Sequence, residues 1–262
     1  MGCSGCRRGR AAPRNDLGVL FGQALRAAPA LALALALGVA HAEPVPQAGP
    51  GAPPQTEQQP ISQAETLLFM TNHLKELQTP SRLHYAFRKR GTLEQGFSDT
   101  VDIDITSGPD GTKKGSARFL SGPRQVASEG VEHVEGNPVV MFYLDREIRE
   151  MSRLTGGAPN HFRRMIRTAL AEAAQIKDVD IQFGGRKMRA QQITISPYQS
   201  DPFHDRYRDQ RLMSKQYLFT MCDTIPGVVY EMRAVVPTAN GSSKDEPVID
   251  ETLTFKSAGN PR

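Results

Sequence analysis

The sequence predicts an α+β domain in which a curled, half-barrel-like antiparallel sheet of about 8–9 strands carries two packed helices. Many segments alternate apolar and polar residues with a period of two, and the connections between them have the length of hairpin turns. Strand and helix patterns do not alternate regularly along the chain. This argues against a doubly wound nucleotide-binding fold, because that fold needs repeated strand–helix–strand units.

The first forty or so residues have the pattern of a secretory signal peptide. A basic region extends to Arg26, an apolar run covers residues 27–40, and Ala40 and Ala42 place small side chains at the cleavage site. The alternating Ala and Leu residues of 30–39 are too few to cross a membrane, which takes about 20 apolar residues. We expect cleavage after Ala42, residence in the periplasm and at most peripheral contact with a membrane.

The leader also accounts for the net positive charge of the chain. It holds five of the 32 basic residues and one of the 28 acidic residues, which leaves 27 of each in the mature protein. A balanced charge removes the main argument for a nucleic-acid partner, so none is expected. Cys222 is the only cysteine after the leader, and we expect it to be a small buried apolar residue.

The mature chain divides into a linker, one domain and a short tail. Residues 43–60 include six prolines and no large aliphatic residue except Val45, so this segment cannot bury enough apolar surface to fold and predicts a disordered linker. Residues 61–257 have the length of a single domain. Residues 258–262 form the tail.

The domain is expected to begin with a helix followed by strands. Ser62 and Glu65 have the spacing of a capping box, and an apolar stripe continues from there to Leu77 before Pro80 ends the helix. Alternating residues at 83–88 and 101–105 then predict two half-buried strands. A turn at 108–111 leads into a third strand at 113–120.

The middle of the chain supplies a buried strand and a second helix. Residues 139–144 are apolar at every position, which predicts a strand covered on both faces and continuing through Ile148 and Met151. Asn160 is a suitable N-cap for a helix. The apolar stripe of that helix contains Phe162, Met165, Ile166, Ala169, Leu170 and Ala173.

The last part of the domain predicts two hairpins and a final strand. Strands at 179–183 and 187–195 flank the turn residues Gly184 and Gly185, and a change of face within the second strand indicates a bulge. A polar loop covers residues 200–211. Strands at 217–222 and 228–236 follow, joined by a type II turn around Pro226 and Gly227, and the last strand is expected at 248–255.

This order of elements resembles that of the LolA-like periplasmic carriers of lipoproteins and lipids. An exported single domain with an early helix, a curled sheet and another helix inserted between hairpins is common to both. The resemblance covers residues 61–255 and rests on compartment, size and the order of elements, with no matching motif. It implies a cleft that binds a lipid.

Motifs that would indicate an enzyme, a metal or a cofactor are missing from the sequence. It contains no Gly-rich phosphate loop, no Gly-x-Ser-x-Gly elbow, no His-Glu-x-x-His helix and no Cys-x-x-Cys pair outside the leader. His73 and Glu76 have a usable ligand spacing, but two ligands do not make a metal site. Asp102 and Asp104 share one strand face, which we expect to be solvated. The sequence therefore favours a protein that is not an enzyme and needs no metal or cofactor.

Three arginines mark the most unusual helix of the chain. Arg163, Arg164 and Arg167 crowd its N-terminal half, where the helix dipole disfavours positive charge, and they alternate with apolar residues. Such a break of a local rule indicates function, so an anionic headgroup or an acidic partner is expected to bind there. Pairing with Glu172 is the alternative. The candidate ligand-binding residues are Phe162, Arg163, Arg164, Ile166 and Arg167.

Three functions remain open at this point. The leading hypothesis is a soluble periplasmic binding or carrier module for a lipid-like or hydrophobic ligand. The first alternative is an envelope assembly or interaction scaffold that offers a sheet edge or the arginine helix to an envelope protein, and a sheet interior without a cavity would favour it. The second alternative is a periplasmic hydrolase that uses the 201–209 loop, which requires His204 and a carboxylate to meet in a pocket.

Overall fold

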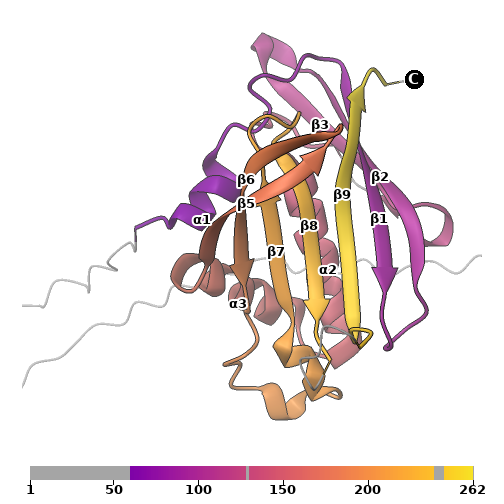
Figure 1. The fold of residues 1–262 in the computed structure, drawn as a ribbon, viewed down its shortest axis with the longest axis vertical. Helices are drawn as coiled ribbons and strands as arrows, with labels where there is room; N and C mark the ends of the chain where they lie inside the picture. The colour runs from indigo at the N-terminus through magenta and orange to yellow at the C-terminus, as the bar shows by residue number, and fades with distance from the viewer. Residues whose placement is uncertain (1–59, 128–129, 239–244, 262) are drawn as a thin grey trace, which may run out of the picture. The chain divides into compact units, whose positions relative to one another are not determined.

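The computed structural model describes residues 60–127, 130–238 and 245–261. The predicted signal peptide and all of the predicted linker except Pro60 lie outside these residues. The described chain forms one antiparallel sheet of nine strands in the order β4-β3-β2-β1-β9-β8-β7-β6-β5 with three α-helices, which confirms the predicted α+β class (Figure 1). The order shows that β1 near the start of the domain pairs with β9 at its end.

Strands β1, β2 and β3 follow the predicted alternation closely and bury every second side chain over much of their length, whereas the edge strand β5 buries only Ile181. In β1, for example, Leu83, Tyr85 and Phe87 are buried and their neighbours are more exposed. The bounds are β1 Ser81–Arg90, β2 Phe97–Ser107, β3 Lys113–Phe119, β4 Val126–Ala127, β5 Gln175–Phe183, β6 Arg186–Ile195, β7 Gln216–Met221, β8 Val229–Val236 and β9 Ile249–Gly259.

Two long helices cover part of the sheet, and a short one precedes it. Helix α2 is Val139–Thr155, α3 is Pro159–Glu172 and α1 is Gln63–Glu65, which continues as a π-helical segment, Thr66–Met70. Figure 1 shows α2 and α3 behind strands β7–β9. The predicted capping box is present, since Ser62 Oγ accepts from the Glu65 N–H and Glu65 accepts from the Ser62 N–H.

The first helix is much shorter than predicted. It ends at Met70 instead of Leu77, and the Thr71 N–H bonds to the Thr66 carbonyl five residues back. Beyond it Leu74 is fully buried and its N–H bonds to the carbonyl of Glu135, so this part of the apolar stripe packs as an irregular segment. Long-range contacts therefore overrode the local helical spacing.

The predicted buried strand at 139–144 is wrong, since these residues begin α2. A short run that is apolar throughout fits a buried strand and a buried helix equally well. Its continuation decides, because Tyr143, Glu147 and Met151 are buried at intervals of four residues and Gly156 ends the helix with φ 80°. Helix α3 is where the sequence predicts it, but Ala158 is its N-cap rather than Asn160, with Pro159 in the first turn.

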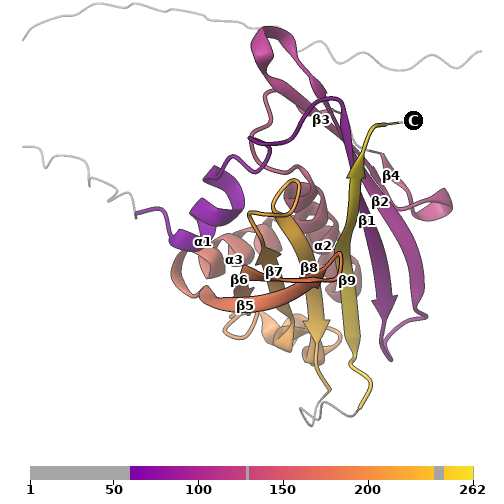
Figure 2. The ribbon, with the colours of Figure 1, turned by 45° about the horizontal axis from the view of Figure 1, so that its top comes forward.

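The β5–β6 hairpin gives the sheet its curl. Figures 1 and 2 show it crossing over the other strands, and Phe183 near its tip lies 5.4 Å from the ring of Phe255 and 6.4 Å from that of Tyr230. The pairing register of β5 with β6 is continuous from Gln175 to Phe183, so the predicted bulge in the second strand is absent from this ladder. The strong twist of the hairpin allows side chains on both faces of β6 to contact apolar neighbours.

A cluster of charged side chains lies beneath α2. Glu147 and Lys215 are fully buried and their charged atoms are 2.6 Å apart, while Arg146 bonds to both Glu147 and Glu251. Lys89 on β1 completes the cluster, with its Nζ 3.0 Å from Glu251 Oε1. These ion pairs join α2 to β1, β9 and the start of β7, so they fix the position of the helix on the sheet.

Candidate functional site

A buried polar network joins four segments at the end of the sheet where β1 begins and β9 ends. Its centre is Asn137, which precedes α2 and donates through Nδ2 to the Gly227 carbonyl at 2.8 Å and to the Tyr85 hydroxyl at 2.9 Å. The Asn137 N–H donates to His73 Nδ1 at 3.0 Å, and His73 Nε2 donates to the Leu67 carbonyl at 2.7 Å. Each contact of Asn137 leads to a different segment, so this one residue holds together the segments that form the walls of the cavity described next.

The network fixes His73 in its neutral form. Nδ1 accepts a hydrogen bond from the Asn137 N–H, so the ring proton must be on Nε2, which donates to the Leu67 carbonyl. Burial lowers the pKa of His73, more than the Leu67 hydrogen bond and the charge of Asp223 raise it. Both ring nitrogens are occupied, so His73 holds the structure together and is not free to act as a base or a metal ligand.

The turn between β7 and β8 forms one wall of the cavity. The Val228 N–H bonds to the Ile225 carbonyl at 2.8 Å and Gly227 has φ 76°, which confirms the predicted type II turn. A Cβ at Gly227 would lie 2.6 Å from Leu83 Cδ1 and 2.8 Å from Asn137 Nδ2, so only glycine fits. Val228 follows with φ 63°, a costly conformation for a β-branched residue and one that often marks functional sites.

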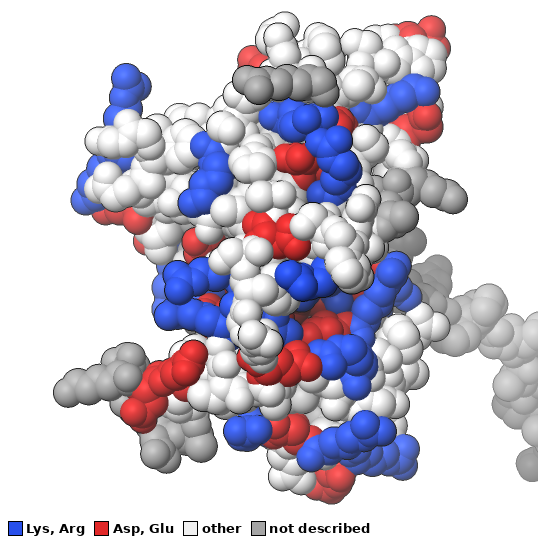
Figure 3. Space-filling model, turned by 90° about the vertical axis from the view of Figure 1, so that its right-hand side faces the viewer, with Lys and Arg blue, Asp and Glu red and all other residues white. Residues whose placement is uncertain are grey.

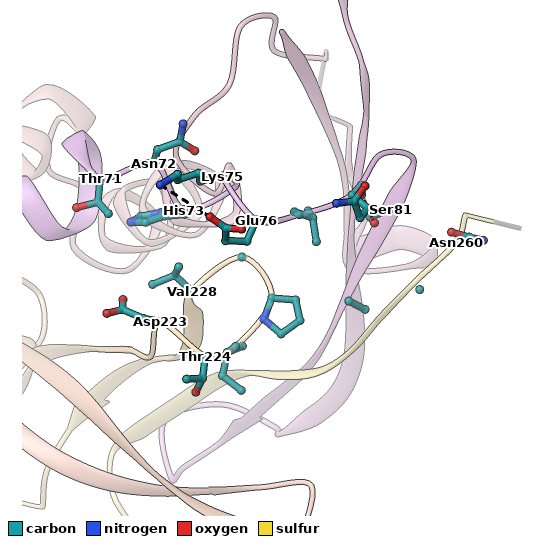
Figure 4. Close-up of a pocket in the computed structure, with 17 residues that line it drawn as sticks. Thr71, Asn72, His73, Lys75, Glu76, Ser81, Asp223, Thr224, Val228 and Asn260 are labelled. Atoms are coloured by element: carbon teal, nitrogen blue, oxygen red, sulfur yellow. Dashed lines mark hydrogen bonds and ion pairs between the residues drawn. The ribbon is translucent and has the colours of Figure 1, made fainter. Parts of the chain in front are cut away.

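We call this cavity the end groove. Its main part, about 540 Å³, lies between the segment 71–78, the turn 223–228 and the end of β9, as Figure 4 shows. A lateral part of about 240 Å³ shares Thr71, Asp223 and Val228 with the main part and reaches Asp178 on β5 and Arg189 on β6. The two parts therefore adjoin along these shared residues and together reach from the edge strand of the sheet to Asn260.

The groove lining mixes apolar and polar groups. Leu77, Ile225 and Pro226 contribute the apolar part, and the exposed side chains of Lys75 and Glu76 stand at the rim, 3.9 Å apart. Three charged side chains of the lining are available to a ligand. Within the described chain, no ion pair or side-chain hydrogen bond is formed by Asp178, Asp223 or Arg189. The arrangement can hold a polar and apolar ligand, and the described lining brings together no acid–base pair.

A second cavity lies between α2 and strands β2–β4. We call it the α2 cleft. It measures about 330 Å³, and its apolar floor is formed by Phe97, Phe119, Leu120, Val126 and Phe142. Basic side chains surround this floor: Arg124 lies over the Phe97 ring at 4.2 Å, and Arg146, Arg149 and Arg153 also line the cleft. Asp145 and Glu150 balance part of this charge.

The predicted ligand-binding residues on α3 point in two directions. Phe162 and Ile166 are buried, and the Phe162 ring packs against Tyr198 and Tyr207 at 5.7 and 6.0 Å. These two side chains therefore belong to the core and do not face the same space as the arginines. Arg163, Arg164 and Arg167 are exposed, and the last two line a cavity of about 400 Å³ with Pro60 and Ile61.

The 201–209 loop does not gather the groups that a hydrolase would need. His204 pairs with exposed Asp205, whereas Asp201 is buried and accepts from His161 Nε2 at 2.6 Å and from the Tyr207 hydroxyl. Burial is the largest single influence on the pKa of Asp201 and raises it. The hydrogen bonds from Tyr207 and His161 together outweigh burial, so the pKa of Asp201 lies below its ordinary value. Asp201 thus anchors the loop to α3.

The remaining sequence candidates have structural partners. Asp104 accepts two bonds from Arg82, and Asp102 bridges His84 at 2.6 Å and Arg118 at 2.9 Å across neighbouring strands. Figure 3 shows acidic and basic side chains interspersed on the side of the molecule where β1 and β2 lie in Figure 1. Gly184 and Gly185 form the expected hairpin turn, and Cys222 is buried as expected.

Sequence reasoning missed Asn137 and Asp223, the residues that shape and line the end groove. Their only signals are an Asn directly before Pro138 and an Asp near the turn at Pro226 and Gly227, and such residues are common in turns without function. The groove is assembled from segments more than a hundred residues apart, so no local pattern identifies it. Within the described residues, no helix is long and apolar enough to span a membrane, and no group of three acidic, His or Cys side chains could hold a metal ion.

Comparison with known proteins gives fold-level similarities. No family model matches the chain, and no curated protein matches it. The similar solved structures include MucB in the MucA/MucB complex of Pseudomonas aeruginosa, with 15% identity over 77% of this chain and 59% of that chain and a TM-score of 0.30. A β-barrel-like protein of a domain of unknown function from Brucella abortus has 9% identity over 70% of this chain and 98% of its own, with a TM-score of 0.31.

A LolA superfamily protein from Nitrosomonas europaea is also similar, with 8% identity over 76% of this chain and 94% of its own and a TM-score of 0.22. A LolA superfamily protein is thus among the similar structures, as the sequence led us to expect. This chain spans 55% to 59% of the length of the MucB chains it matches. At these identities the similarity concerns the fold alone.

Proposed function

We propose that this protein is an exported binding module that holds an extended segment of a partner protein in the end groove. The observation that carries the proposal is that the two parts of the groove adjoin, so that together they reach from Asp178 on the edge strand to Asn260 after β9. A long groove with alternating apolar and charged contacts suits an extended chain better than a compact small molecule. This proposal corresponds to the first alternative drawn from the sequence, an interaction scaffold. The binding surface is the end groove instead of the sheet edge or the arginine helix expected from the sequence.

The packing of the interior supports an interaction module over a carrier with an internal ligand. Tyr143, Phe162, Tyr217 and Phe219, which lie between the long helices and the sheet, are all fully buried by their neighbours. Side chains at native density leave little room for a lipid there. Both nitrogens of His73 are bonded, so the end groove offers no free imidazole for acid–base catalysis, which favours binding over hydrolysis.

A peptide library tests the proposal. The purified protein is screened against randomised heptapeptides, and the enriched peptides are mapped by NMR chemical-shift changes. We expect peptides with Kd below about 1 mM that shift residues 71–78 and 223–228. No enriched peptide, or shifts confined to other surfaces, would overturn the proposal.

Charge reversal inside the groove supplies the matched control. Asp223→Arg changes an exposed residue common to both parts of the groove and is expected to weaken the selected peptides at least about tenfold, through lost charge pairing and occupied space. Asp205→Arg makes the same charge change on a distant exposed loop residue and should leave affinity within about twofold. Equal effects of the two variants would mean that the groove is not the binding site.

A second candidate function, the lipid-like ligand of the leading sequence hypothesis, is favoured by the α2 cleft. Its apolar floor ringed by guanidiniums suits a single-chain anionic amphiphile. Native mass spectrometry with lauric acid should show one added ligand. Phe142→Asp should abolish the added mass, whereas Met141→Asp, on the exposed side of the same helix, should retain it. Loss in both variants, or in neither, would exclude the cleft.

A further inference from the structure

Large apolar side chains are exposed together on the N-terminal segment of the domain. Ile61, Phe69 and Met70 are 61%, 38% and 61% exposed, and they make up half of the six large exposed apolar residues in the described chain. Single exposed apolar residues need no explanation, but three within ten residues form a patch. Ile61 directly precedes the N-cap Ser62, and Phe69 and Met70 end the π-helical segment, so exposed apolar side chains flank the short helix at both ends.

The neighbouring surface of α3 carries guanidiniums with weak protein contacts. Arg163 donates to Asn160 Oδ1 at 2.6 Å and reaches Asp145 at 3.8 Å, so its charge is partly compensated. Arg164 contacts only His161 Nδ1, at 3.3 Å, and for Arg167 no hydrogen bond or ion pair is present among the described residues. The N-terminal half of a helix disfavours positive charge, so Arg164 and Arg167 lack the compensation that a purely structural role would provide.

The N-terminal segment and the arginines of α3 are neighbours. Ser62 Oγ donates to the Leu170 carbonyl at 2.9 Å, which fixes the N-terminal segment against α3. Ile61, Arg164 and Arg167 line the same cavity of about 400 Å³. Figures 1 and 2 both show α1 beside α3. We call Ile61, Arg164 and Arg167, together with the exposed Phe69 and Met70 of the same N-terminal segment, the basic apolar face.

Two carboxylates lie near this face and do not neutralise it. Glu65 is held by the capping box, where it accepts from the Ser62 N–H at 3.0 Å. Glu172 is exposed at the last residue of α3 and forms no ion pair in the described chain. The guanidiniums are therefore free to meet an external anion.

We propose that the basic apolar face docks on the surface of an anionic phospholipid bilayer. The guanidiniums bind lipid phosphates, for which their planar fork is well suited, while Ile61, Phe69 and Met70 enter the boundary between headgroups and acyl chains. An acidic protein surface would satisfy the arginines but would leave three flexible apolar side chains without a matching pocket. A bilayer satisfies both, because it offers anionic headgroups above fluid hydrocarbon.

Vesicle flotation tests the proposal. The protein is recovered from the cells that produce it, its N-terminus is determined by mass, and it is mixed with vesicles of phosphatidylcholine alone or of an equimolar mixture with phosphatidylglycerol. We expect flotation with the mixed vesicles only, decreasing as salt is added. Failure to float with mixed vesicles would overturn the proposal, and binding to polyglutamate instead would identify an acidic protein as the partner.

Two double variants with the same charge change locate the surface. Arg164→Gln with Arg167→Gln is expected to lower the vesicle partition coefficient at least about tenfold. Arg88→Gln with Arg186→Gln removes two exposed arginines from β1 and β6 and should change it less than about twofold. Equal losses in the two variants would show that binding follows net charge and not this face.

The apolar part of the face has its own test. Ile61→Ser with Met70→Ser should weaken flotation while leaving its salt dependence in place, because the arginines remain. Both residues are exposed, so thermal unfolding of the variant should match that of the parent protein. Unchanged flotation would remove the insertion step and overturn the bilayer as the occupant of the face.

Discussion

Single residues decide the geometry of the end groove. Asn137 ties α2 to β1, to the N-terminal segment and to the β7–β8 turn. It does so through its side-chain NH₂ group, its side-chain oxygen Oδ1 and its backbone N–H. Buried hydrogen-bonding groups cost about 1–3 kcal/mol when they lose a partner. The groove is therefore sensitive to changes that do not touch a ligand.

The network predicts a specific pH dependence of stability. Because burial lowers the pKa of folded His73 below its ordinary value of 6.5, the unfolded chain takes up a proton first as the pH falls. The stabilising contribution of His73 is complete above about pH 6.5 and is lost below it. The free energy of unfolding then falls with a limiting slope of about 1.4 kcal/mol per pH unit. Urea unfolding of the wild type between pH 7.5 and 5 should show this loss.

The control for this prediction is His73→Gln, which cannot titrate. We expect it to be less stable at pH 7.5 but to lose little more between pH 7.5 and 5. The carboxylates with lowered pKa, such as Asp99 and Asp250, keep their stabilising contribution over this range, because it is lost only as the pH falls below their ordinary pKa of 3.8. An identical pH slope in the variant would show that His73 is not the group responsible.

Gly227 offers a second prediction at the residue scale. Gly227→Ala adds a Cβ that meets Leu83 and Asn137 at a positive φ, so we expect a loss of at least about 2 kcal/mol in unfolding free energy. Gly185→Ala is the matched control, because its φ is 74° but its Cβ would meet nothing within 4 Å. Denaturant unfolding measures both, and equal losses would mean that backbone conformation alone accounts for the effect.

At the scale of elements, buried charge holds α2 in place. Burial, the largest influence, lowers the pKa of Lys215, but the carboxylates of Glu147 and Glu251 together raise it above its ordinary value. The ammonium therefore remains charged inside the protein. Removing one member of such a pair leaves the other buried without a partner, which costs about 3–5 kcal/mol.

We therefore predict that Lys215→Met destabilises the protein by about 3–5 kcal/mol. Glu147→Gln should also destabilise it, and the double variant should be less destabilised than the sum of the two by about 1–3 kcal/mol, since the charges are removed together. Denaturant unfolding of the three variants measures this coupling. Additive losses would show that the two side chains do not stabilise each other.

The same scale explains why α2 was missed in the sequence. The run at 139–144 is too short to show a period, so an entirely apolar segment fits a buried strand and a buried helix equally well. Glu147 is buried at a helical position because Lys215, far along the chain, neutralises it. A pattern based on hydrophobicity cannot show this, since the pairing exists only in the folded protein.

For the whole molecule, the pairing of β1 with β9 closes the domain. Residues near both of its ends thus enter the same sheet, and β9 continues to Gly259, past the tail boundary expected at residue 258. The described part of the chain begins at Pro60, shortly after Glu57. We predict that a chain starting at Glu57 unfolds in one transition with the same midpoint as the longer protein, measured by calorimetry. A lower midpoint would show that residues before Glu57 contribute to folding.

The sequence by itself determined the α+β class, most of the strand positions, the capping box at Ser62 and the turn at Pro226 and Gly227. These features follow from local periods and from the φ preferences of a few residues, which neighbours in the sequence are enough to set. The arginines of α3 are exposed, as binding to an external anion requires, but Arg163 has local partners in Asn160 and Asp145.

The tertiary structure alone decided where the helices end, that 139–144 is helical and that the end groove exists. Each depends on contacts between distant segments: Leu74 with Glu135, Glu147 with Lys215, and Asn137 with Gly227. Such contacts add free energy only after the chain has closed long loops, and nothing in the local sequence records which loops close. The binding surfaces of this protein are therefore properties of its fold, although their residues are ordinary in the sequence.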